Sequence, residues 1–302
     1  MNSVCAVIVT YNRSELLCRC IRYLQKQDYP LDVLIYDNHS SENVKKILED
    51  EKLLNDNTIY YYAEVNSGGA GGFYYGMEMA IKRGYKYLWL MDDDGYPMHQ
   101  NTLSTLMEDI PRIKGNKFCL NSLVVQNEDG TKVSFAVQRE YAVSSIKKNA
   151  ANGLIYNEIM PFNGTLISSD LVKQIGYPVK EFFVYGDENE YYLRIRNSGA
   201  IMAIDINSLY YHPTNVEKVV MVFGKKIYYV KMPRWKTYCA ARNKTYIAKK
   251  YFGMSGVLKL TLRDLLYIIV VPGDRVGRLI ETVKGRKDGL QNKFDRKLDF
   301  SK

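Results

Sequence analysis

One run of the sequence, Tyr87–Gly95, constrains the fold and the chemistry of this chain more than any other segment. It begins with five apolar or aromatic residues, the pattern of a buried strand, and ends with Asp92, Asp93, Asp94 and a glycine. The carboxylates are therefore expected at the carboxyl end of a strand, where open α/β sheets bind their ligands. Because adjacent carboxylates repel one another, we expect a counter-charge there, most simply a hard divalent cation with oxygen ligands. For the triplet alone, a solvated acidic turn is the alternative.

Strands and helices alternate along the N-terminal part of the chain. Four strands are predicted, over Val4–Thr10, Asp32–Asp37, Thr58–Ala63 and Tyr87–Met91, with helical patterns between them. This order predicts an α/β fold with a mostly parallel, Rossmann-like sheet and helices on both faces. Further along, two separate strands are predicted, over Ile201–Ile206 and Ser208–His212.

Charge divides the chain into two parts. Residues 1–217 contain 21 Lys and Arg against 27 Asp and Glu, whereas residues 218–302 contain 21 against 6, a net charge of +15. We therefore predict a catalytic domain over 1–215 and a basic, mainly helical C-terminal region over 216–302. Its helices are predicted over Arg234–Tyr251, Val257–Val271 and Val276–Lys284. This density of basic residues favours an anionic partner such as lipid headgroups, nucleic acid or a pyrophosphate-bearing acceptor.

The apolar run Leu265–Val271 in this region is too short to cross a bilayer, which takes about 20 apolar residues. It fits either a core helix or an amphipathic helix lying among lipid headgroups. Five cysteines with no metal-ligand spacing, and an N-terminus without a signal-peptide pattern, fit a cytosolic protein.

The polar residues after the first three predicted strands suit a nucleotide diphosphate. Asp37 could accept a hydrogen bond from a pyrimidine imide, and Thr10 and Asn12 could bond the base or ribose. The glycines of Gly68–Gly72 would let backbone N–H groups approach a phosphate at a helix N-terminus. The residues expected to bind the nucleotide or its diphosphate are Thr10, Asn12, Arg13, Asp37, Asn38, Asn66, Gly68, Gly69, Gly71, Gly72, Asp92 and Asp93.

The segments Val7–Arg13, Tyr36–Ser40 and Asp92–Asp94 resemble motifs of the family 2 inverting glycosyltransferases with the GT-A fold. They occur in the same order and with the same spacing as in that family. The resemblance covers roughly residues 3–215. The segment Asn66–Phe73 resembles the branch that contains galactofuranosyl- and rhamnosyltransferases of bacterial cell-surface polysaccharides, capsule included. The pattern Q-x-x-R-W of processive synthases is absent from the sequence, which favours the addition of one sugar per event.

This resemblance implies roles for individual residues. Asp92 and Asp94 would hold Mn2+ or Mg2+ and, through it, the donor diphosphate, and His212 matches a position where some relatives supply a further metal ligand. The general base falls at Asp187 or Glu188. The aligned position is Glu188, but most relatives have aspartate there, so both residues remain open. Capping of a helix N-terminus is the structural alternative for this pair.

The resemblance also implies partners and a location. The expected donor is UDP-galactofuranose or another UDP-hexose, with dTDP-rhamnose as the alternative, and the acceptor is a polyprenyl-linked glycan. A cytoplasmic enzyme held peripherally at the anionic inner membrane surface is expected, and an oligomer is left open. The rival functions are a nucleotidyltransferase, disfavoured because Ser67–Gly76 contains no Lys or Arg, and a nucleic-acid-binding protein, disfavoured because no RNA-binding signature occurs.

On the first predicted C-terminal helix, Trp235 is expected either to contact the acceptor or to pack that helix. Tyr238, Arg242 and Asn243 lie on the same helix at a useful spacing.

Overall fold

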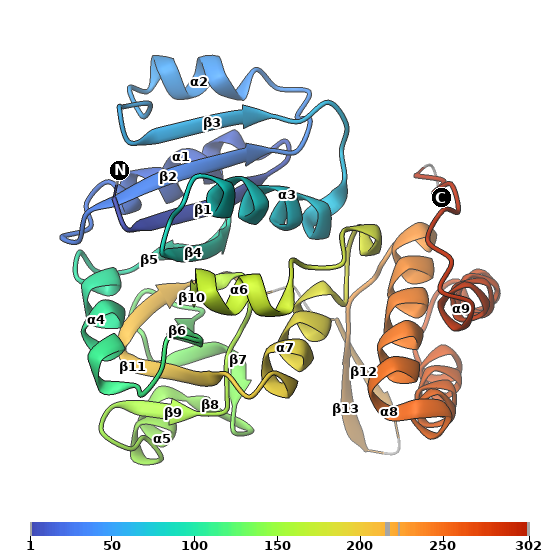
Figure 1. Cartoon of the computed structure of the whole chain (residues 1–302). Coiled ribbons are helices and arrows are strands. Elements are labelled where there is room, and N and C mark those ends of the chain that lie inside the picture. Colours follow the sequence, from blue (N-terminus) through green and yellow to red (C-terminus); the bar gives the residue numbers. More distant parts are fainter. Residues whose placement is uncertain (1, 215–217, 223, 301–302) are drawn as a thin grey trace. The chain divides into compact units, whose positions relative to one another are not determined.

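The computed structural model describes residues 2–214, 218–222 and 224–300 (Figure 1). The chain forms two compact units. Unit 1 consists of Met1–Lys180 and Tyr191–Thr214, and unit 2 of Glu181–Glu190 and Asn215–Lys302. Each unit is described by itself.

Unit 1 is built on one large mixed sheet whose main path has the strand order β3-β2-β1-β4-β10-β6-β11-β5. Its parallel half contains β1 (Val4–Thr10), β2 (Leu31–Asp37), β3 (Thr58–Tyr62) and β4 (Tyr87–Asp92). The other strands are β5 (Tyr96–Pro97), β6 (Phe118–Val125), β7 (Lys132–Val137), β8 (Glu140–Ala142), β9 (Leu154–Tyr156), β10 (Asn163–Ser168) and β11 (Ile201–Tyr211). Strand β10 runs antiparallel to both β4 and β6, whereas β11 is parallel to β6.

Helices cover both faces of this sheet (Figure 1). They are α1 (Ser14–Leu24), α2 (Val44–Asp50), α3 (Gly68–Lys82), α4 (Thr102–Asp109), α5 (Val143–Lys148), α6 (Ser169–Ile175) and α7 (Asp187–Asn197), whose first turn belongs to unit 2. Alternate residues of β1 enter two different cores, as the period of a strand requires. Ile8 packs with the α1 residue Leu17, while Val7 packs with the α3 residue Met77. The α/β fold with a mostly parallel central sheet is therefore confirmed.

The prediction of two strands near residues 201–212 was wrong in one respect. A single strand, β11, runs from Ile201 to Tyr211, and its register against β6 shifts between Asp205 and Leu209. The register shift coincides with the predicted break between the two strands. A bulge adds residues to one strand without ending it, so it interrupts the sequence pattern although the strand continues.

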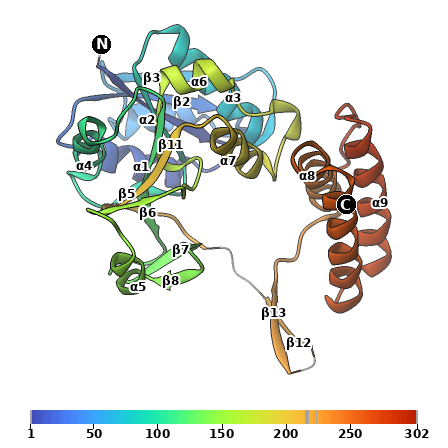
Figure 2. The same cartoon turned by 60° about the horizontal axis from the view of Figure 1, so that its bottom comes forward.

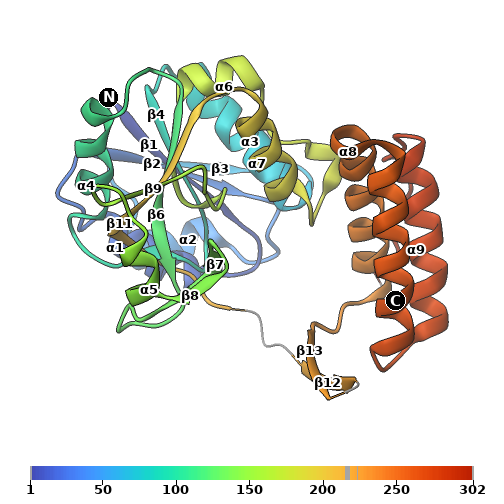
Figure 3. The same cartoon turned by 90° about the horizontal axis from the view of Figure 1, so that it is seen from below.

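Unit 2 contains the hairpin of β12 (Lys218–Val222) and β13 (Lys225–Tyr229), which the sequence pattern did not predict, and two helices (Figure 2). Helix α8 (Arg234–Val270) joins the two predicted helical segments, but Gly253 within it has non-helical angles, φ 66° and ψ −165°. Helix α9 (Arg275–Leu290) lies beside α8 in both further views (Figures 2 and 3). Their close approach depends on small residues, since a Cβ at Gly285 would lie 2.5 Å from the Tyr238 carbonyl oxygen. Within the described residues, no helix combines the length and apolar content needed to cross a membrane.

Candidate active site

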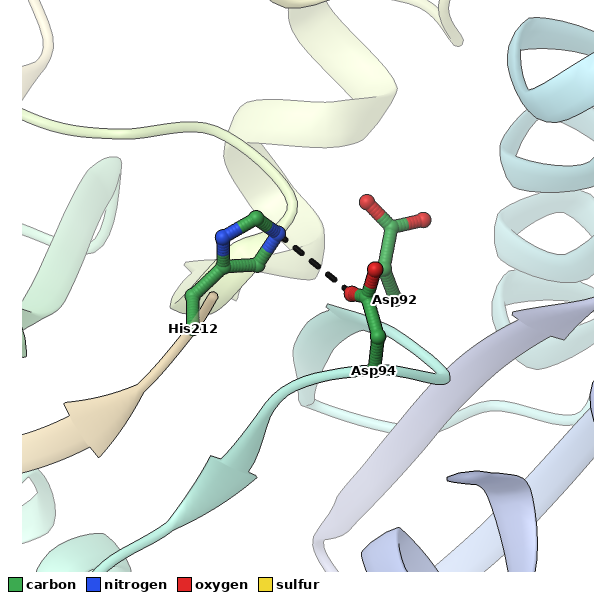
Figure 4. A group of neighbouring side chains, drawn as sticks. All are labelled: Asp92, Asp94 and His212. Atoms are coloured by element: carbon green, nitrogen blue, oxygen red, sulfur yellow. Dashed lines mark ion pairs between the residues drawn. The ribbon is translucent and has the colours of Figure 1, made fainter. Parts of the chain in front are cut away.

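Two carboxylates and one imidazole converge at the carboxyl end of strand β4. Asp92, Asp94 and His212 each place one potential ligand atom so that these atoms all lie within 4.8 Å of one another (Figure 4). His212 Nε2 is 3.4 Å from Asp94 Oδ1. That carboxylate oxygen is shielded from solvent and makes no hydrogen bond within the described part of the chain. Oxygen and imidazole donors gathered in this way suit a divalent cation.

Strand pairing brings His212 to the acidic turn. The short strand β5 follows the triplet directly and pairs antiparallel with the end of β11, with Tyr96 opposite Tyr211. His212, the residue after Tyr211, therefore lies next to the turn that carries Asp94. Gly95 permits this approach, because a Cβ there would lie 2.4 Å from the Tyr210 hydroxyl oxygen.

Burial lowers the pKa of His212, while the nearby Asp94 carboxylate opposes that shift. The net shift favours the neutral imidazole near pH 7, and the neutral form is the one that binds metals.

The middle aspartate of the triplet has different surroundings. Asp93 is buried, and its carboxylate accepts hydrogen bonds from the Thr10 hydroxyl at 2.8 Å and from Arg13 Nη1 at 3.2 Å. Arg13 Nη1 also lies 3.0 Å from Asp94 Oδ2. Part of the counter-charge expected for the triplet is therefore supplied by Arg13. Burial raises the pKa of Asp93 to about 6, against the lowering effect of Thr10 and Arg13.

The polar residues after β2 hold the neighbouring loops together. Asp37 is fully buried, and its two oxygens accept hydrogen bonds from the Ser40 backbone N–H at 2.9 Å and from the Tyr60 hydroxyl at 2.5 Å. Asn38 donates to the Gly68 carbonyl at 2.9 Å and accepts from the Ser67 backbone N–H at 2.9 Å. These bonds fix the loop that leads into α3. Contact of Asp37 with a base remains a prediction.

Two more of the expected nucleotide-binding residues take part in this loop network. Asn12 Oδ1 accepts from the Ser41 backbone N–H at 2.7 Å, and Asn66 Oδ1 accepts from the Gly68 N–H at 2.8 Å.

The glycines at the start of α3 serve two different purposes. Gly68 has φ 71°, a left-handed conformation that glycine adopts without strain. Gly72 faces the sheet, and a Cβ there would lie 2.3 Å from Val9 Cγ1. At Gly69, by contrast, nothing lies within 4 Å of an added Cβ. Gly72 therefore allows α3 to pack closely on β1, a role that the interpretation of the run as a phosphate loop did not include.

The predicted general bases lie in unit 2, in the first turn of α7. Asp187 is buried and Glu188 is exposed. Burial raises the pKa of Asp187 to about 6, although backbone N–H groups of the same turn act in the opposite direction. Glu190 is also buried, and its Oε1 accepts from Lys250 Nζ and the Tyr251 hydroxyl, each at 2.8 Å.

Two buried side chains of α8 hold the segment before Asp187. Asn243 Nδ2 contacts the carbonyl oxygens of Phe182, Val184 and Tyr185 at 2.9, 3.0 and 2.7 Å. Arg242 Nη2 donates to the carbonyl of Phe182 at 2.9 Å, and Arg242 Nε donates to Asn243 Oδ1 at 2.9 Å.

These bonds stabilise an unusual backbone conformation. Phe183 and Tyr185 have φ values of 66° and 64°, which are uncommon for residues with side chains. The helical pattern predicted from the sequence includes Arg242 and Asn243, but their function as hydrogen-bond donors to this segment is visible only in the folded chain.

Comparison with known proteins identifies the family. Residues 5–153 match the family model described as glycosyl transferase family 2. The chain contains a glycosyltransferase family 2 domain. This transferase is also 28% identical to the galactofuranosyltransferase GlfT1 of Mycolicibacterium smegmatis, over 97% of this chain and 98% of that protein.

Solved structures support the GT-A fold. The transferase resembles GalNAc-T7 with UDP, GalNAc and Mn2+, with a TM-score of 0.61 and 15% identity, covering 96% of this chain and 56% of that one. It also resembles Staphylococcus aureus TarS 1–349 in complex with UDP-GlcNAc, with a TM-score of 0.56 and 15% identity, covering 98% of this chain and 93% of that one. The family 2 domain and the similarity to GlfT1 make the chain a nucleotide-sugar glycosyltransferase, as its motifs predicted. The nucleotidyltransferase and nucleic-acid-binding alternatives receive no support from these comparisons.

Proposed function

We propose that this enzyme transfers one galactofuranosyl residue from UDP-galactofuranose to a lipid-linked glycan, with inversion at the anomeric carbon. The observation that carries the proposal is the convergence of Asp92, Asp94 and His212 at the end of β4. The choice of sugar is supported by the similarity to GlfT1, which extends over nearly the whole of both chains.

Asp92, Asp94 and His212 fit a divalent cation, with Mn2+ or Mg2+ as the candidates. Asp94 Oδ1 is shielded and makes no hydrogen bond among the described residues, so a cation would satisfy an oxygen that is otherwise left with His212 alone. A bound divalent cation would act as a Lewis acid that stabilises charge on the leaving diphosphate. The Mn2+ in the GalNAc-T7 structure supports this choice of cofactor.

The chain's own residues would organise the donor around that site. Arg13 balances the charge of Asp93 and Asp94, which keeps three neighbouring carboxylates compatible with a folded turn. The loop Asn66–Gly68, fixed by Asn38, leads into α3, and the N–H groups that follow Gly68 at this helix N-terminus would be the donors to an anion. Together these residues would orient the nucleotide before transfer.

Proton removal from the acceptor hydroxyl is assigned to the acidic turn of α7. Asp187 is the preferred base because its pKa, raised by burial to about 6, lies closer to neutral pH than that of an ordinary aspartate. Glu188 remains the alternative base. Inverting transfer needs one such base and no covalent nucleophile, because the acceptor oxygen itself attacks the anomeric carbon as the diphosphate leaves.

The remaining parts of the proposal concern the acceptor and the location. We assign residues 1–215 to catalysis and residues 216–302 to association with a polyprenyl-linked acceptor or with the membrane that carries it. The +15 net charge of residues 218–302 supports this assignment, because such acceptors carry a diphosphate and bacterial inner membranes are anionic.

The test uses the purified protein with Mn2+, a synthetic polyprenyl-diphosphate-linked glycan, and radiolabelled UDP-galactofuranose, UDP-galactose or dTDP-rhamnose in separate reactions. We expect product only from UDP-galactofuranose. The anomeric configuration of the product, determined by NMR, should be inverted relative to the donor. Preferred transfer from dTDP-rhamnose would instead favour the rhamnosyltransferase branch.

A substitution at Asp94 tests the proposed metal site independently of the donor sugar. Asp94→Asn should abolish both transfer and Mn2+-dependent UDP binding measured by calorimetry. Asp56→Asn is the matched control, because Asp56 is exposed and precedes β3. It therefore lies near the amino end of a parallel strand, whereas Asp94 follows the carboxyl end of β4. If Asp94→Asn binds UDP with unchanged dependence on Mn2+, the assignment of the metal site is wrong.

A further inference from the structure

Unit 2 exposes an unusual amount of apolar surface on two adjacent helices. In the second half of α8, the side chains of Leu258, Leu262, Leu266 and Ile269 are between 56% and 65% exposed. On α9, the side chains of Val276, Ile280 and Val283 are between 44% and 70% exposed. Single exposed apolar residues are normal on protein surfaces, but a contiguous group marks an interaction surface.

The spacing of these residues places them on one stripe of each helix. On α8 they recur every three or four residues, and on α9 they follow the same period, so each set lies along one helical face. The opposite side of α8 is already packed, since Val257, Leu260 and Ile268 are buried. The exposed stripes are therefore additional to the core of the unit.

The two helices share a hollow of about 350 Å³ beside these stripes. Leu265 of α8 lines it together with Leu279 and Val283 of α9, and polar side chains such as Thr261 and Arg286 complete the lining. Because α8 and α9 lie side by side, we treat their exposed apolar residues as one surface, defined by Leu258, Leu262, Leu266, Ile269, Val276, Ile280 and Val283, and call it the α8–α9 face.

Basic side chains flank this face. Lys259 and Arg263 follow Leu258 and Leu262 directly on α8, Lys284 follows Val283 on α9, and all three are exposed. They belong to a region with a net charge of +15. An apolar stripe bordered by lysine and arginine is the pattern of helices that lie in the headgroup layer of anionic membranes.

We infer that the α8–α9 face docks on the surface of an anionic phospholipid bilayer, with its leucine, isoleucine and valine side chains inserted among the headgroups. The helices would lie in the plane of the membrane, since no helix of the described residues is long and apolar enough to cross it. A second copy of the chain fits this face less well, because two regions of +15 would then be brought together. The inference rests on the proposed lipid-linked acceptor for its place in the reaction, because such an acceptor is held in the same membrane.

The experiment is co-sedimentation of the full chain with vesicles of phosphatidylcholine and phosphatidylglycerol, compared with vesicles of phosphatidylcholine alone. We expect binding to the anionic vesicles that weakens with added salt. The triple variant Leu262→Ser, Leu266→Ser, Ile269→Ser should lower the partition coefficient at least tenfold. Retained binding by this variant, or equal binding of the unmodified chain to both vesicle types, would overturn the inference.

A matched control carries three substitutions of exposed apolar residues elsewhere, Tyr141→Ser, Tyr156→Ser and Met221→Ser, and should bind like the unmodified chain. Analytical ultracentrifugation of the same proteins tests the other occupant. A dimer that the triple variant converts to a monomer, with no vesicle binding by either, would assign the face to a second copy and refute the membrane inference.

Failure of this inference can be distinguished from failure of the proposed function. Mn2+-dependent UDP binding and transfer to an acceptor analogue with a short alkyl chain should be unchanged in the triple variant, since its substitutions lie outside the donor site. A different donor sugar would revise the proposed function and leave the vesicle result intact.

Discussion

Asn243 offers the sharpest test of how the fold controls the proposed base. Its amide is fully buried and contacts three carbonyl oxygens of the segment that leads into Asp187. The substitution Asn243→Ala removes this donor from the buried Phe182 carbonyl and from the partly buried carbonyls of Val184 and Tyr185. The change therefore acts on the conformation that positions Asp187 and not on the carboxylate itself.

The magnitude follows from the bonds that are lost. An amide NH2 group has two hydrogens, so the three contacts amount to about two hydrogen bonds, each with a net value of about 0.5–1.5 kcal/mol. The left-handed conformations of Phe183 and Tyr185 add to the cost of keeping the segment in place. A loss of about 2 to 3 kcal/mol in the stability of the positioned state corresponds to roughly a 30- to 150-fold lower kcat.

The assay is steady-state transfer to an acceptor analogue, together with the melting temperature and the UDP dissociation constant. We expect kcat to fall while UDP binding, which we propose for unit 1, is unchanged. Thr245→Val is the control, because Thr245 is equally buried on α8 and its hydroxyl donates to the Ala241 carbonyl of the same helix. A kcat for Asn243→Ala within about threefold of the unmodified enzyme would refute the positioning argument, since it would correspond to less than about 1 kcal/mol.

Four further predictions concern the base (two of them), the helix–sheet packing and the metal. If Asp187 is the base, kcat should fall about tenfold per pH unit below pH 6 and level off above it, because only the carboxylate accepts the proton; a profile abolished by Glu188→Gln and kept by Asp187→Asn would transfer the role to Glu188. Because burial raises the pKa of Asp187 in the folded state, the free energy of unfolding should decrease as pH rises from about 4 through 6 and the buried carboxyl ionises. Asparagine cannot ionise, so Asp187→Asn should raise the urea midpoint at pH 7 and leave it unchanged near pH 3.5. Gly72→Ala should destabilise unit 1 by about 1–3 kcal/mol in urea unfolding, because its Cβ meets Val9, whereas Gly69→Ala, with open space around it, should be neutral or slightly stabilising. His212→Ala should weaken Mn2+-dependent UDP binding by at least about tenfold, or ~1.4 kcal/mol, in calorimetry, and an unchanged affinity would exclude it as a ligand.

The local pattern of the sequence was sufficient for the parallel half of the sheet and for the position of the acidic triplet. Continuous apolar runs such as Val4–Thr10 and Tyr87–Met91 have one favourable environment, a strand covered on both faces, and the polar residues after them must then lie at one edge. The same periodicity located the two helical segments of α8 and most of α9. These features depend on neighbours within a few residues, which is why they could be read from the chain alone.

The tertiary structure decided how those residues are used. Pairing of β5 with β11 brings His212 to Asp94, packing against Val9 makes Gly72 a contact residue of the sheet, and Arg242 and Asn243 bond to carbonyls that precede them by about sixty positions. None of these contacts produces a repeating pattern in the sequence, because each depends on how elements that are distant in the sequence pair and pack. The amino-acid pattern thus determined which strands and helices form and where the charged residues stand on them, and only the folded chain determined which side chains meet.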